Sequence, residues 1–269
     1  MMKSPKEQAL EKSLLRLLAP DSLPLTLAGM LMEDEEIQLL QDHANSVSIK
    51  RLGYNDHGPV HMRQVAVNAV RMLGLLKEAG IETNLEREQT GSYEDSLCAI
   101  ILASFLHDLG MTVGRQDHEM LSVIIARPIM DRILQALLPQ DAVRRVVIAS
   151  TATEGIFGHM ANRRIHSLEA GLILIADGCD MQKGRARIPM TIHSTPRVGD
   201  IHKYSSNAIE EVAIRKGQEK PIGISITMTT DVGFFQVEEV LLQKISMSPV
   251  KPYIELYAAV RDQETKQYL

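Results

Sequence analysis

The chain has 269 residues, of which 45% are hydrophobic, only 4% are aromatic and 14 are methionine, a composition that favours aliphatic helices over a β-sandwich. Its 29 basic and 34 acidic residues give a net charge of −5, which disfavours nucleic acid and membrane surfaces as partners. Cys98 and Cys179 lie far apart in apolar segments and indicate buried thiols of a reducing compartment. We therefore expect a cytoplasmic protein without a secretory signal or a membrane span.

The first 183 residues carry apolar side chains at helical spacing. Pro59 suits the first turn of a helix, where its missing N–H would be unpaired anyway. Ser92 and Asp95 resemble a capping box at the start of another helix, and Pro128 predicts a kink or an interruption. We expect helices over residues 5–18, 33–51, 59–80, 92–107, 117–137, 139–149 and 166–182.

The pattern changes after about residue 184. Ser206 could cap a short helix over residues 207–216, and the alternation in residues 222–228 predicts a strand. A helix over 237–245 and a second strand over 253–257 follow. The chain is therefore predicted to be mainly α, with a helical domain over residues 1–183 and a small α+β subdomain over residues 184–269 packed on it.

The pair His107-Asp108 is the most informative feature of the helical part. It ends an apolar run over residues 96–106. A carboxylate at the end of a buried helix costs several kcal/mol, about 3 to 5, unless something pairs with it. A divalent cation would neutralise the aspartate and use the imidazole nitrogen. The pair therefore predicts a metal site.

Three more polar residues stand on otherwise apolar helices. His61 lies one turn inside the helix that Pro59 opens, Asp177 ends an aliphatic stretch, and His118 opens the helix after the His-Asp pair. Helices that face each other in a bundle build metal sites from such side chains. We expect His61, the pair His107-Asp108 and Asp177 to converge on one cation.

In this order, His61, His107-Asp108 and Asp177 resemble the HD superfamily of metal-dependent phosphohydrolases. Residues 55–61 and 105–110 are similar to the sequence contexts of that signature. The resemblance covers residues 50–183, and implies an HD-type helical bundle whose metal ligands are His61, His107, Asp108 and Asp177. The small α+β subdomain over residues 184–269, the C-terminal appendix, is similar to extensions of some members, but no chemistry follows from that.

Some members of the superfamily hold a second metal through histidines on the two following helices. His118 matches the first of these positions. The next helix offers Ser150, Thr151, Thr153 and Glu154 where histidines would stand. Glu154 could replace them as an oxygen ligand, yet a single metal, or a second one held weakly, is the expected state.

Basic side chains could bind a phosphate ester, because the planar fork of arginine matches phosphate oxygens. Lys183, Arg185 and Arg187 follow Asp177, and the resemblance places a Lys or Arg of this segment near the substrate phosphate. Lys183 and Arg187 would stabilise charge during catalysis, with Arg115 as a further substrate contact. The alternative is a solvated helix end. The neighbouring histidines have ordinary interpretations. His57 is expected to be a turn residue. His159 and His166 flank the loop before the last site helix, where either could touch substrate, but a solvent-facing loop position is the expectation.

The resulting hypothesis is metal-assisted hydrolysis of a phosphoester, with Asp108 among the catalytic residues. The substrate would be a nucleotide or a small phosphorylated metabolite. Imidazole and carboxylate ligands suit Mn, Fe, Co, Ni or Zn, and Mg if waters complete the shell. The alternative is a non-catalytic HD-like module that binds a nucleotide or metal, and the appendix could then form a homo-oligomer or sensor surface.

Overall fold

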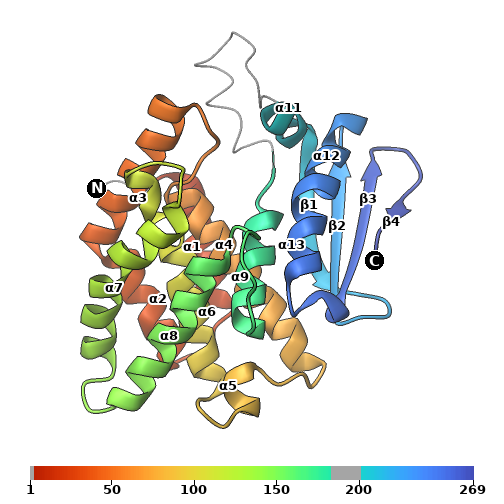
Figure 1. The fold of residues 1–269 in the computed structure, drawn as a ribbon. Coiled ribbons are helices and arrows are strands. Elements are labelled where there is room, and N and C mark those ends of the chain that lie inside the picture. The colour runs from red at the N-terminus through yellow and green to blue at the C-terminus, as the bar shows by residue number, and fades with distance from the viewer. Residues whose placement is uncertain (1–2, 183–200) are drawn as a thin grey trace.

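The protein is mainly α-helical, with a small four-stranded sheet at its C-terminal end (Figure 1). A computed structural model describes residues 3–182 and 201–269. The helical part comprises α1 (Pro5–Arg16), α2 (Leu23–Glu33), α3 (Glu35–Ser46), the π-helical turn η1 (Val47–Leu52), α4 (Pro59–Glu78), α5 (Asn84–Arg87), α6 (Tyr93–Leu106), the 3₁₀ turn η2 (Leu109–Thr112), α7 (His118–Leu137), α8 (Ala142–Gly158) and α9 (Leu168–Cys179).

The apolar helix α6 lies at the centre of the helical body, between α4, α8 and α9. Ser92 and Asp95 form the predicted capping box at its start. Every side chain over residues 96–106 is buried. The helical stretch over residues 93–112 is long and apolar enough to cross a membrane, but 94% of its apolar 18-residue window is buried inside the protein. Here the apolar run builds the core of the bundle.

A buried arginine fixes the start of α4 against α1 and α3. Arg63 is 1% exposed, and its guanidinium donates to Glu11 Oε1 at 2.8 Å, Gln41 Oε1 at 3.0 Å and Gln38 Oε1 at 3.1 Å. A buried guanidinium is stable only when paired and hydrogen-bonded in this way. The network holds the first turn of α4, which carries His61, in one position.

The C-terminal unit, residues 201–269, contains α11 (Ile201–Ala208), β1 (Ile209–Lys216), β2 (Ile222–Met228), η3 (Asp231–Gly233), α12 (Phe234–Gln236), the π-helical turn η4 (Val237–Leu241), α13 (Leu242–Met247), η5 (Lys251–Tyr253), β3 (Ile254–Val260) and β4 (Lys266–Gln267). The strand order is β1-β2-β3-β4. β2 and β3 are parallel, with Ile222 opposite Ile254, whereas the outer pairs are antiparallel. The helical connection η3–η5 provides the crossover that a parallel pair requires.

This unit packs on the helical body through α13 and η4 against α9, and through β1 against α4. In Figure 1, α13 lies between α9 and the sheet. The predicted boundary near residue 184 falls outside the described residues. The described part of the unit is in direct contact with α9, the helix that carries Asp177.

Most predicted elements are present, but the structure differs from the prediction in three details. Residues 209–216 form strand β1 and not the predicted helix. Its charged side chains look helical in sequence, but Ile209 and Ile214 are buried and the strand pairs with β2 at the sheet edge. The predicted helix 139–149 starts later and runs to Gly158, while α7 continues through Pro128.

Candidate metal centre

Helix ends carry the four residues predicted as metal ligands. Pro59 opens α4, so His61 lies in its first turn. His107 ends α6, and Asp108 follows it at the start of η2. Asp177 lies in the last turn of α9. The packing of α4, α6 and α9 brings residues that are far apart in the sequence into contact. His61 lies 46 positions from His107 and 119 positions from Asp180, and it contacts both.

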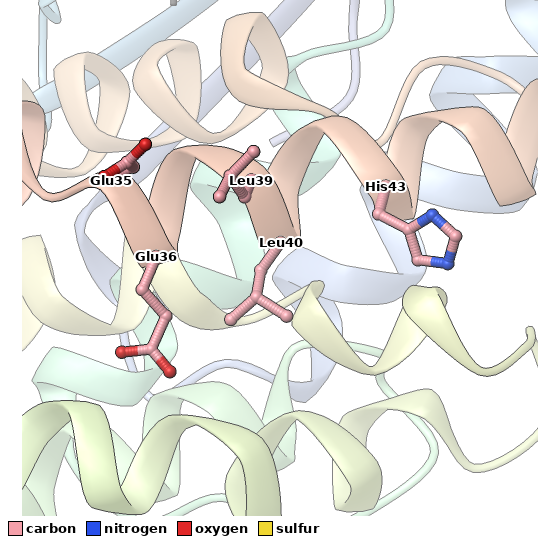
Figure 2. Close-up of a pocket in the computed structure, with 5 residues that line it drawn as sticks. All are labelled: Glu35, Glu36, Leu39, Leu40 and His43. Carbon is pink, nitrogen blue, oxygen red and sulfur yellow. The ribbon is translucent and has the colours of Figure 1, made fainter.

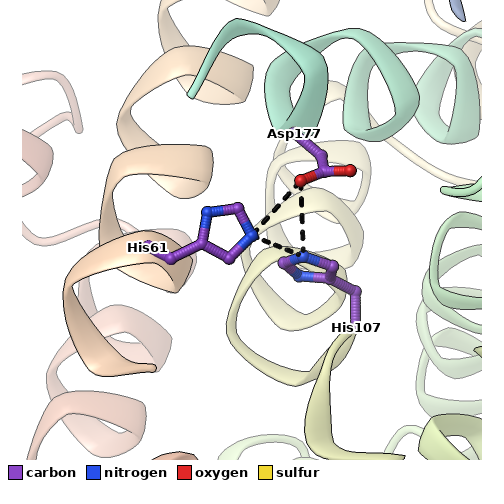
Figure 3. Close-up of side chains that lie close together, drawn as sticks. All are labelled: His61, His107 and Asp177. Atoms are coloured by element: carbon purple, nitrogen blue, oxygen red, sulfur yellow. Dashed lines mark hydrogen bonds and ion pairs between the residues drawn. The ribbon is translucent and has the colours of Figure 1, made fainter. Parts of the chain in front are cut away.

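His61, His107 and Asp177 form a first group (Figure 3). The Nε2 atoms of the two histidines are 3.2 Å apart. Asp177 Oδ1 lies 3.2 Å from His61 Nε2 and 4.0 Å from His107 Nε2. Figure 3 shows the three polar ends pointing toward one another from three separate segments. Together these atoms could hold a metal ion.

A second group lies beside the first and contains His107, Asp108 and His159, with His118 in contact. His118 begins α7, and His159 follows the last residue of α8. Their Nε2 atoms are 3.0 Å apart. The ring of His159 also stands 4.8 Å, centre to centre, from that of His107. Four imidazoles therefore form one continuous buried chain.

Asp108 lies between the two imidazole pairs. Its Oδ2 is 3.4 Å from the Nε2 atoms of both His61 and His107. Its Oδ1 is 3.2 Å from His118 Nε2 and 3.4 Å from His159 Nε2. Oδ1 is buried, and no described residue makes a hydrogen bond of good geometry to it. A buried carboxylate oxygen without such a partner fits a cation.

The outer nitrogen of each ring fixes its tautomer. Nδ1 of His107 faces Ser104 O at 3.0 Å, that of His118 faces Arg115 O at 2.9 Å, and that of His159 faces Ile156 O at 2.7 Å. A carbonyl oxygen only accepts, so each Nδ1 carries a proton and donates it. In the neutral rings the Nε2 atoms then carry bare lone pairs that face one another across about 3 Å, as metal ligands do.

His61 has the same arrangement with a carboxylate instead of a carbonyl. Its Nδ1 is 2.7 Å from Asp180 Oδ2. Asp180 follows α9 directly and is 5% exposed. A carboxylate on the outer nitrogen of a histidine orients the ring and makes its other nitrogen a stronger ligand. Asp180 was not among the predicted site residues, because only the fold brings it to His61.

Burial and neighbouring charges act in opposite directions on the two acids. Burial by itself raises the pKa of Asp108, but the electrostatic interaction with His107 and His57 outweighs it and holds that pKa well below its ordinary value. For Asp177, burial is likewise outweighed by the Lys244 ammonium and by His61, so its pKa is also well below the ordinary value. Both carboxylates are therefore anionic at neutral pH.

The pKa of His159 is lowered from 6.5 to about 4, mainly by burial. His107 and His118 lower it further, whereas Asp108 acts to raise it. Between these two values the unfolded chain binds more protons than the folded chain, so stability falls as the pH falls. We expect chelator-treated protein to lose about 2 kcal/mol of unfolding free energy between about pH 7 and pH 5. Urea titrations at both pH values measure this loss. His159→Gln should remove it and His166→Gln, at an exposed position, should not; equal losses in all three proteins would contradict it.

The structure corrects the interpretation of His159 and Glu154. His159 is 1% exposed and belongs to the centre, so its assignment to a solvent-facing loop was wrong. Glu154 does not take the position of a second-metal ligand, because its Oε1 accepts the backbone N–H groups of His166 and Ser167 before α9. His159 directly follows the last residue of α8, as His107 follows the last residue of α6, but the sequence prediction had ended that helix at Ala149.

The predicted phosphate-binding residues are only partly described. Arg115 lies near the centre, with its guanidinium 6.0 Å from the Tyr54 ring and Nη2 3.6 Å from Met160 Sδ, while its carbonyl accepts from His118. The other three predicted residues, Lys183, Arg185 and Arg187, lie outside the described residues. Sequence reasoning missed Lys244, whose ammonium contacts Asp177.

A separate surface hollow lies along α3 (Figure 2). Its lining residues are Glu35, Glu36, Leu39, Leu40 and His43. All of them lie on this one helix, and none belongs to the two groups described above. The carboxylates of Glu35 and Glu36 lie near the start of α3 and the imidazole of His43 lies near its end. These groups do not converge on one point, so we assign no chemistry to the hollow.

These observations define a mainly helical protein with a buried His/Asp cluster that could hold a metal ion. The chain is 36% identical to the uncharacterized protein MJ1020 of Methanocaldococcus jannaschii over 242 residues, which cover 90% of this chain and 91% of that protein. The chain therefore belongs to the same family as MJ1020. No protein-family model and no solved structure matches the chain.

Proposed function

We propose that this protein is a metal-dependent phosphohydrolase of the HD type, acting on a nucleotide or a small phosphorylated metabolite. The observation that carries the proposal is the position of Asp108. Its two oxygens face two separate imidazole pairs, all deep in the core. One carboxylate between two sets of nitrogen ligands is the arrangement that two neighbouring cations share.

The residues divide into two cation positions. His61, His107, Asp177 and Asp108 Oδ2 would hold one cation, and His118, His159 and Asp108 Oδ1 would hold the other. The expectation from the sequence was a single metal, or a second one held weakly. The second position proposed here goes beyond it, because His159 adds an imidazole beside His118. Imidazole with carboxylate favours Mn, Fe, Co, Ni or Zn, with Mg a weaker candidate.

The chain's own residues would then bind and orient the substrate. A divalent cation in such a site supplies a Lewis acid that polarises phosphoryl oxygens and lowers the pKa of water. Arg115 could contact a phosphate oxygen, and Lys183, Arg185 and Arg187 remain predicted contacts. Their charges would stabilise the phosphoryl group electrostatically, without a covalent intermediate. Asp180 would keep the His61 ring in place.

The test is metal analysis together with hydrolysis assays on one preparation of the full chain. We expect purified protein to contain a transition metal and to hydrolyse an aryl phosphate, an aryl phosphodiester, or members of a panel of nucleoside monophosphates and cyclic nucleotides. A chelator should abolish turnover, and one of the six metals should restore it.

Two histidine variants make the assay specific. His159→Ala should lower both the metal content and the turnover, whereas His166→Ala, on the exposed surface, should change neither. Tight metal binding without turnover of any substrate in the panel would replace the hydrolase proposal by the non-catalytic module. Absence of bound metal in wild-type protein would overturn both.

A further inference from the structure

Lys244 reaches from the C-terminal unit to the metal centre. It lies on α13 and is 7% exposed. Its Nζ donates to Asp177 Oδ2 and, at 2.8 Å, to the carbonyl oxygen of His159. One ammonium therefore contacts a residue from each of the two proposed cation positions.

A glycine on α9, Gly178, leaves space for the side chain of Lys244. A Cβ atom at Gly178 would lie 3.0 Å from Lys244 Cδ and 3.1 Å from Leu241 Cδ1. Two turns earlier on α9, a Cβ atom at Gly171 would lie 2.5 Å from Ser248 Oγ, and that hydroxyl donates to Gly171 O at 3.1 Å. These two glycines allow α13 to approach α9 closely. The aliphatic part of the Lys244 side chain therefore packs closely over Gly178, next to Asp177.

The contact determines how Asp177 faces the cluster. The ammonium engages Oδ2, which leaves Oδ1 as the oxygen near the Nε2 atoms of His61 and His107. The second contact holds the carbonyl of His159, whose ring contacts His118. An ammonium with three donors is suited to hold two separate acceptors at once.

We infer that Lys244 is a positioning residue that orients Asp177 and His159 for the cations, and that the C-terminal unit is thereby an integral part of the metal centre. This inference rests on the metal centre of the proposed function but not on hydrolysis. It assigns a role to the C-terminal unit, which carries none of the predicted ligands.

Charge alone predicts the opposite effect of removing Lys244. A positive charge beside Asp177 repels a cation, so a purely electrostatic role would make the metal bind more tightly in Lys244→Met. A positioning role makes the metal bind more weakly, because an aspartate and a histidine that are no longer held must be ordered by the metal itself. Loss of such supporting contacts typically lowers metal affinity by about 10- to 100-fold.

The experiment is a Co²⁺ titration of the metal-free full chain, following the visible absorption of bound Co²⁺. We expect Lys244→Met to weaken Co²⁺ binding by about 10-fold or more and to change the absorption band. Lys244→Arg, which keeps the charge and the donors, should recover most of the affinity. Lys266→Met removes an exposed lysine of the same unit that pairs with Glu238, and should match wild type.

Equal or tighter Co²⁺ binding in Lys244→Met would overturn the inference. Should that variant fail to fold, Gly178→Ala keeps the charge and presses on the lysine stem; it is expected to shift the Co²⁺ band, and an unchanged band would overturn the inference. Wild-type protein that takes up no Co²⁺ overturns this inference and the proposed function together. If the variants show the expected order of Co²⁺ affinities but the protein cleaves no phosphoester, the positioning role of Lys244 is supported and only the hydrolase proposal is rejected.

Discussion

Asp108→Asn is expected to abolish metal-dependent turnover, with a loss of about 10³-fold or more, because cation assistance contributes several kcal/mol to such reactions. The asparagine has the shape of the aspartate but removes the charge that both proposed cations would share. Its amide replaces one oxygen by a donor, so it can serve only one imidazole pair as an acceptor. Metal content should fall with turnover, as elemental analysis of the purified variant would show.

The matched control is Asp131→Asn, which removes an exposed carboxylate from the pair with Arg127 on α7. It should keep wild-type metal content and turnover. Far-ultraviolet circular dichroism should show the same helix content in both variants. Undiminished hydrolysis in Asp108→Asn would remove this residue from the reaction and with it the shared-carboxylate arrangement.

The sequence predicted those parts of the site whose signal is local. His61, His107 and Asp177 stand out because each is a polar residue on an apolar helix, and such residues need a partner when buried. The capping box of Ser92 and Asp95 likewise needs only a few neighbouring residues. The structure brings the four predicted ligand residues together, and His118 lies beside them in contact with His159.

The missing parts depend on contacts between distant segments. Lys244 lies 67 positions from Asp177, and nothing in residues 237–245 distinguishes it from a lysine on a solvated helix. His159 was missed because the helix before it was ended about nine residues too early, at Ala149 instead of Gly158. Strand β1 was taken for a helix, since only pairing with β2 reveals its period.

The connection between the His-Asp pair and α7 depends on Gly110. A Cβ atom there would lie 2.0 Å from the His118 carbonyl oxygen and 2.7 Å from the Ser122 backbone nitrogen. Both contacts are with backbone, so no side chain can rotate away. The same glycine donates its N–H to Ser122 Oγ at 2.8 Å. This close approach sets the distance between Asp108 and His118.

Gly110→Ala is therefore expected to lower the free energy of unfolding by about 3 kcal/mol or more, at the upper end of overpacking effects. Since α7 must move away, His118 moves with it, and metal affinity should fall by about 10-fold or more. Urea denaturation of the metal-free protein measures the first effect and a Co²⁺ titration measures the second.

Gly114→Ala provides the control four residues later, because a Cβ atom at Gly114 meets nothing within 4 Å. Its unfolding free energy should stay within about 1 kcal/mol of wild type, and an increase is as reasonable as a decrease because alanine reduces the entropy of the unfolded chain. If both variants were equally stable, the approach of η2 to α7 could not be as close as described. Asp108 and His118 would then lack the rigid connection that holds one carboxylate between two imidazole pairs.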